Sequence, residues 1–159
     1  MDDMKKQEMA RKAFATICAT LDARDWKYSK EEINGNPVIR LGVNGEDIPM
    51  DLVIIVDVER TVIRVLSPMP FKFPEDKRVA GAIACCIVSN GFADGSMDYD
   101  LSDGSVTYRM AASYRGTEIG QQLCDYLLGC SLAMVDRYND RLMMLAKGLI
   151  DLETFLKDK

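Results

Sequence analysis

The sequence of 159 residues contains no histidine. Histidine is the usual general base near neutral pH, the partner of serine and cysteine nucleophiles, and the commonest ligand of zinc. The phosphate-binding pattern GxxxxGK[ST] and the dinucleotide-binding pattern GxGxxG are missing as well. The sequence therefore predicts no catalytic residue, no metal ligand and no cofactor, and we expect that the chain is not an enzyme.

The sequence has fewer basic than acidic residues. Lys and Arg total 20 against 25 for Asp and Glu, which gives a net charge of −5. The basic residues form no cluster along the chain. Because an acidic surface repels the phosphates of nucleic acids and anionic lipids, we expect neither nucleic acid nor membrane as a partner.

Long hydrophobic segments are absent too. The longest uncharged apolar segment covers residues 79–88, about half of the ~20 residues that a membrane-spanning helix needs. The first residues are polar and lack the apolar core of a signal peptide. The expected location is the cytoplasm.

The cysteines are odd in number and none of them forms a CxxC motif, which argues against a disulfide framework. Thiols stay reduced in the cytoplasm, and a reduced cysteine in an apolar stripe is a small buried hydrophobe. We expect Cys85 and Cys86 both to be buried and unreactive. The five cysteines are Cys18, Cys85, Cys86, Cys124 and Cys130.

The composition, with 48% hydrophobic and 28% charged residues, is typical of a globular protein, and residues 1–159 are predicted to form a single domain. Hydrophobic spacing predicts an α+β fold with the order α-β-β-β-β-α-β-β-α and a twisted antiparallel sheet of five or six strands with helices packed on it. The predicted helices are 4–23, 74–90 and 118–147, the last capped by Thr117. The predicted strands are 26–33, 37–43, 50–58, 61–67, 95–101 and 105–111.

Proline and glycine mark the borders of these elements. Asn34-Gly35-Asn36 and Asp103-Gly104 favour tight turns between neighbouring strands. Pro68, Pro70 and Pro74 lack the amide proton that sheet pairing needs, so the fourth strand is expected to end before them.

The second predicted helix is apolar on every side and must therefore be covered on every side. One stripe is bulky and is expected to face the sheet: Val79, Ile83, Cys86 and Ile87. The opposite stripe is small and suits the close approach of another helix, from this chain or from a second copy. Its predicted contact residues are Gly81, Ala84, Cys85 and Val88.

Residues 79–145 resemble YbjN-type bacterial proteins, which are described as regulators of sensory transduction. The likeness rests on the apolar helix ending at Ser89-Asn90-Gly91-Phe92, on the hairpin Met97-Asp98-Tyr99-Asp100-Leu101 to Arg109, and on Val135-Asp136-Arg137-Tyr138 in the long helix. The resemblance implies a fold similar to that of type III secretion chaperones, which are often dimeric. It also implies a non-enzymatic role in protein binding or regulation, and it carries over no catalytic residue.

Two functions follow as hypotheses. The first is a chaperone-like or regulatory protein-binding module, whose partner is another protein or a second copy of the chain as a homodimer. The alternative is a small-molecule-binding sensor, with its ligand held between the sheet and the long C-terminal helix.

Overall fold

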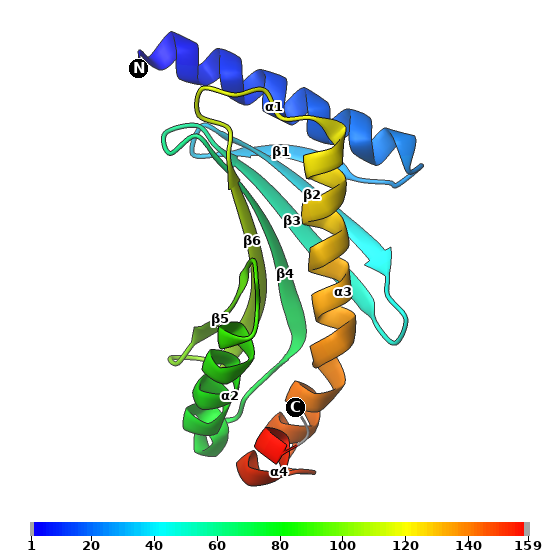
Figure 1. Ribbon diagram of the computed structural model, residues 1–159, viewed down its shortest axis with the longest axis vertical. Helices are drawn as coiled ribbons and strands as arrows, with labels where there is room; N and C mark the ends of the chain where they lie inside the picture. Colours follow the sequence, from blue (N-terminus) through cyan, green and yellow to red (C-terminus); the bar gives the residue numbers. More distant parts are fainter. Residues whose placement is uncertain (1, 158–159) are drawn as a thin grey trace.

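The computed structural model describes residues 2–157, in which six strands form one antiparallel sheet in the order β1-β2-β3-β4-β6-β5 (Figure 1). The strands are β1 (Ser29–Ile33), β2 (Asn36–Asn44), β3 (Pro49–Asp57), β4 (Val62–Lys72), β5 (Ser96–Asp100) and β6 (Ser105–Ser113). The helices are α1 (Asp3–Ala23), the 3-10 turn η1 (Glu75–Lys77), α2 (Arg78–Asn90), α3 (Gln121–Ala146) and α4 (Leu152–Lys157). The predicted α+β class and element order are confirmed, with η1 and α4 as short additions.

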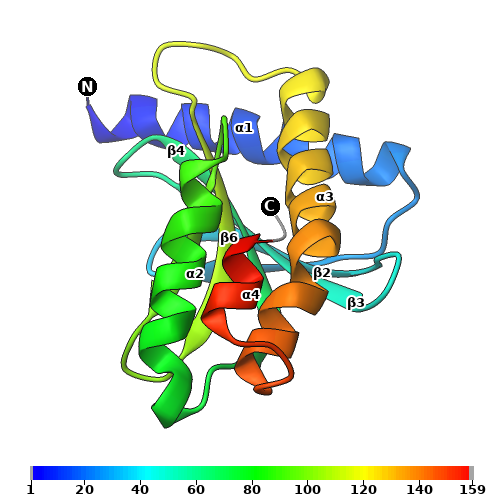
Figure 2. The ribbon, with the colours of Figure 1, turned by 60° about the horizontal axis from the view of Figure 1, so that its bottom comes forward.

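The helices cover one face of the sheet. Helix α1 contacts β3 and α3, helix α3 contacts β4 and β6, and helix α2 contacts β5. Along β3, Leu52, Ile54 and Val56 are buried, whereas Val53 and Ile55, which point to the opposite face, are only half-buried. We call that opposite side the open face. Figures 1 and 2 show α1 across one end of the sheet, α3 along it, and α2 at the other end.

Helix α1 begins at its predicted place because Asp2 caps it. The Asp2 carboxylate accepts a hydrogen bond of 2.8 Å from the backbone amide of Lys5, which satisfies one of the free amides of the first turn. The apolar stripe that the sequence predicts is buried against the sheet and α3, as Ala13, Ile17 and Leu21 show.

Strand β4 differs from the prediction because it continues through Pro68 and Pro70 to Lys72. Its pairing with β3 ends at Leu66, so beyond that residue β4 pairs only with β6. The register shifts between Pro68 and Lys72. A proline is tolerated at such a one-sided, irregular position because no second strand needs its missing amide proton.

Helix α3 begins later than predicted. Its N-cap is Gly120, which offers no side-chain hydrogen bond, and the Thr117 hydroxyl lies instead near the carbonyl of Glu118. After α3 the chain turns back, and α4 lies beside α2 and α3 (Figure 2). Phe155 anchors it: this residue is buried, and the Arg141 guanidinium lies 4.8 Å from its ring centroid.

Within residues 2–157, no helix combines the length and the apolar character that crossing a membrane requires.

Candidate functional site

The predicted small-residue stripe of α2 is buried inside the chain. Gly81, Ala84, Cys85 and Val88 are the buried residues of this helix. A Cβ atom on Gly81 would lie 2.7 Å from Cγ of Phe73 and 2.7 Å from the hydroxyl of Tyr99. The rings of Phe73 and Tyr99, 5.8 Å apart, fill the space that the small side chains leave.

The predicted orientation of α2 is therefore wrong. The small stripe faces the sheet and the bulky stripe faces outward, because Phe73 and Tyr99 already supply the volume at this interface. Val79 is 68% exposed, Ile83 is 39% exposed, and Cys86 is exposed as well. Since the predicted contact residues are covered by this chain's own side chains, a contact between α2 and a second copy would use the outward stripe.

The outward side of α2 continues onto a neighbouring turn. The side chain of Lys77, just before α2, packs against Gly148, and the next residue, Leu149, is 68% exposed. We call Val79, Ile83, Cys86 and Leu149 the α2 patch. From Val79 to Asn90 the helix carries no charged residue, so this part of the patch is apolar and uncharged, and Lys77 lies on the side of Leu149.

The two adjacent cysteines have opposite environments. Cys86 is exposed in the α2 patch, contrary to the prediction, whereas Cys85 is buried as predicted. Burial raises the pKa of the Cys85 thiol to about 12, because the charged thiolate is poorly solvated inside the protein. Only Cys86 of this pair can react with a reagent in solution.

Charge on the open face is organised in pairs. Asp57 is almost fully buried at the end of β3 and accepts hydrogen bonds from the backbone and side chain of Arg60 and from Arg64. Burial alone would raise the pKa of Asp57, but the hydrogen bonds from Arg60 and the charges of both arginines lower it. Arg109 is paired with Asp98 in a similar way, at 2.6 Å.

A groove of about 510 Å³ lies between α1 and the loop before α3. Met9, Ala13 and Ile119 contribute apolar surface to it, and Lys12 and Glu118 form an ion pair of 3.6 Å beside it. Lys5 lines the groove as well, and these side chains do not converge on one point that would select a ligand.

A smaller cavity of about 190 Å³ lies between the loop after α2, strand β6 and helix α3. We call it the aromatic cavity, because four aromatic side chains and two charged ones line it: Phe92, Tyr108, Tyr126, Tyr138, Asp94 and Arg137. Phe92 stands between two of these rings, with its centroid 5.6 Å from that of Tyr108 and 5.5 Å from that of Tyr138.

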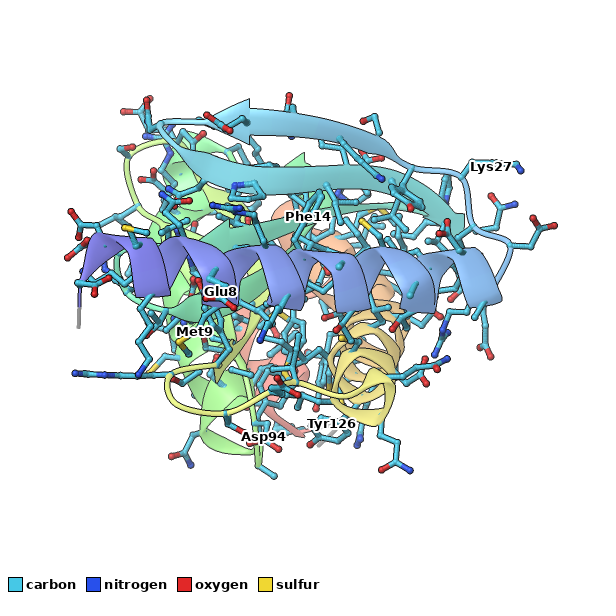
Figure 3. All side chains as sticks on the ribbon, turned by 90° about the horizontal axis from the view of Figure 1, so that it is seen from above. Glu8, Met9, Phe14, Lys27, Asp94 and Tyr126 are labelled. Atoms are coloured by element: carbon cyan, nitrogen blue, oxygen red, sulfur yellow. The ribbon has the colours of Figure 1, made fainter. Side chains whose placement is uncertain are left out.

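The polar groups of the aromatic cavity are connected. The Tyr126 hydroxyl donates a hydrogen bond to the carboxylate of Asp94, and the two residues lie together in Figure 3. The Tyr108 hydroxyl donates to the backbone carbonyl of Asp94 at 3.2 Å. The bond to Asp94 raises the pKa of Tyr126, and burial raises the pKa of Tyr108 to about 12, so both phenols stay neutral donors.

The sequence did not reveal the aromatic cavity. Its aromatic residues come from a loop, a strand and a helix, separated by up to 46 positions between Phe92 and Tyr138 (138 − 92). Tyr108 and Tyr138 fit the apolar stripes of their own elements, so periodicity explained them fully. They come together only because α3 packs against β6 in the folded chain.

Among residues 2–157, no three side chains of Cys, Asp or Glu gather in a way that could hold a metal ion. A scan against family models and a search of curated proteins found no match to this chain.

Proposed function

We propose that the chain is a non-enzymatic protein-binding module, chaperone-like or regulatory, and that it contacts protein through the α2 patch. The observation that carries the proposal is a helix whose outward face is apolar and uncharged. A helix on a protein surface normally presents polar side chains to water, and an exposed apolar patch marks an interaction site. The likeness to YbjN-type proteins supports the same proposal.

A second copy of the chain suits the α2 patch because the outward face of α2 is nearly symmetric about Ile83. Val79 lies four residues before Ile83, and Ile87 lies four residues after it. In an antiparallel pair of α2 helices, Val79 of each copy would face Ile87 of the other, a self-complementary contact of the kind that two-fold dimers make. The absence of charge lets two acidic molecules approach there without facing like charges.

Sedimentation of the native chain and of Ile83→Asp tests this proposal. We expect a dimer that the aspartate converts to a monomer, since a carboxylate would be buried without a partner at the centre of the contact. Ala19→Asp is the matched control, because Ala19 is exposed on α1, far from the patch. A native chain that stays monomeric up to about 1 mM would rule out the second copy as the occupant.

A cross-link defines the geometry of the pair. In a Cys86→Ser chain, Ile83→Cys should form a disulfide between two copies, because residue 83 lies on the two-fold axis and its Cα atoms approach closely. Val79→Cys in the same background should not, because it faces residue 87 of the other copy. Equal cross-linking at both positions would contradict the antiparallel arrangement.

A second candidate function is a small-molecule sensor, and one observation favours it. The aromatic cavity lies between β6 and α3, where this alternative places a ligand. Its volume of about 190 Å³ is smaller than the ~300–1,000 Å³ of usual ligand pockets, so it suits a small group rather than a whole cofactor.

A further inference from the structure

We infer that the aromatic cavity binds a small ligand through an alkylammonium group, which the tyrosine and phenylalanine rings and the carboxylate of Asp94 hold together. This inference does not rest on the α2 patch, because no residue of that patch lines the cavity. Its basis is the coincidence of aromatic rings and an unpaired carboxylate in one cavity.

The first step is the charge of Asp94. Its carboxylate lines the cavity and accepts a hydrogen bond from the neutral Tyr126 hydroxyl. No lysine or arginine among residues 2–157 forms an ion pair with it, whereas Asp57, Asp98 and Asp103 each have a cationic partner. A cation that enters the cavity would give this carboxylate the same kind of partner.

The second step is the nature of the cation. Aromatic rings attract cations through their electron-rich faces, and this attraction is largest for a weakly hydrated cation such as an alkylated ammonium. The ring centroid of Phe92 lies 5.6 Å from that of Tyr108 and 5.5 Å from that of Tyr138, and Tyr126 adds a fourth ring to the lining. Ring walls beside a carboxylate favour an organic cation over a metal ion, which prefers several oxygen ligands.

The third step is the place of the one cation that already lines the cavity. The Arg137 guanidinium lies 5.4 Å from the ring centroid of Tyr138, so this ring already makes a cation–π contact. A ring of this lining thus already accepts a cation on its face.

The size of the cavity limits the ligand. About 190 Å³ leaves room for a methylated ammonium with a short substituent but excludes a nucleotide or a flavin. The ammonium could belong to a free small molecule or to a methylated lysine side chain of a protein, and both present the same chemistry to the cavity.

Titration with choline chloride, followed by nuclear magnetic resonance of the tyrosine ring protons, tests the inference. The control ligand is 3,3-dimethyl-1-butanol, in which an uncharged carbon replaces the nitrogen of choline. We expect choline to shift the ring protons of the cavity and to bind about tenfold more tightly than the neutral analogue. Equal binding of the two compounds, or no binding of choline, would overturn the inference.

Substitutions assign the binding to the cavity. Asp94→Asn should weaken choline binding about tenfold, because it removes the charge and keeps the shape. The matched control is Asp22→Asn, since Asp22 accepts a comparable hydrogen bond from Tyr28 at 2.9 Å outside the cavity. Tyr138→Leu should abolish binding and Tyr138→Phe should keep it, because only the first removes a ring. Binding that survives Asp94→Asn and Tyr138→Leu would show that choline binds elsewhere.

A peptide containing trimethyllysine distinguishes the two sources of the ammonium. Tighter binding of this peptide than of choline would identify a protein side chain as the ligand, and weaker binding would identify a free small molecule. The inference would be contradicted if the chain binds the trimethyllysine peptide no better than the same peptide with alanine in place of trimethyllysine, and also does not bind choline.

Discussion

Helices α1 and α2 lie across opposite ends of the same sheet but differ in how they meet water (Figure 1). Helix α1 buries an apolar stripe and exposes Glu8, Arg11 and Lys12. Helix α2 buries its small residues and exposes Val79 and Ile83. Helix α1 exposes Met4 near its start, but charged side chains follow along its exposed face, whereas α2 carries no charge from Val79 to Asn90. This contrast is the reason why we propose a protein contact for α2 and not for α1.

The largest expected difference concerns the thiols of α2. A pKa near 12 lowers the thiolate fraction of Cys85 about a thousandfold below that of an ordinary cysteine. Maleimide should therefore label Cys86 and leave Cys85 unmodified until the protein unfolds, as peptide mapping by mass spectrometry would show. Labelling of Cys86 should slow as the protein concentration rises if a second copy covers it, and rapid labelling of Cys85 would contradict its burial.

The inner face of α2 should be the most sensitive to added volume. Gly81→Leu should lower the free energy of unfolding by about 3 kcal/mol, because the new side chain would collide with Phe73 and Tyr99. Ala19→Leu, on the exposed side of α1, should change it by less than about 0.5 kcal/mol. Urea unfolding of both variants measures the difference, and equal stabilities would show that the inner face is not tightly packed.

The contribution of Asp57 to the free energy of unfolding should depend on pH. Asp57 lies at the end of the sheet beside α1. The pKa of Asp57 is lower in the folded chain than in the unfolded chain, so its stabilising effect is complete above the unfolded value near 4 and is lost as the pH falls through the folded value. Asp57→Asn should cost about 2 kcal/mol at pH 7. Urea unfolding from pH 7 to pH 2 should show a smaller loss of stability in this variant than in the native chain. Parallel curves would argue against this role of Asp57.

The smallest effect is expected for the ion pair that joins α1 to the β3–β4 turn. Lys6 and Glu59 are 2.7 Å apart, but the Glu59 side chain is 80% exposed. Glu59→Gln should therefore change the free energy of unfolding by less than about 0.5 kcal/mol. Thermal unfolding at low and high salt measures this, and a large loss would show that charge rather than packing holds α1.

Much of this fold could be predicted, since the order of strands and helices follows from hydrophobic spacing and from turns such as Asp103-Gly104. Two features could not. The extension of β4 past Pro68 depends on its having a partner on one side only, which is a property of the whole sheet. The orientation of α2 depends on Phe73 and Tyr99, which fill the interface from outside the helix.

The candidate site was predicted in part. The apolar character of α2 drew attention to this helix, but the face that it exposes is the opposite of the one expected. The aromatic cavity was missed because Phe92, Tyr108 and Tyr138 lie far apart in the chain and each fits a local pattern. A cavity formed by tertiary packing leaves no periodic signal in the sequence.

Strand β1 is the outermost strand of the sheet, next to β2 only, and all five of its residues are exposed. Its free backbone groups could template another strand and so let sheets join into long assemblies. Lys30, Glu31 and Glu32 oppose this, because docking a neighbour there would strip water from three charged side chains. Growth of the sheet beyond one molecule is thus discouraged at this margin.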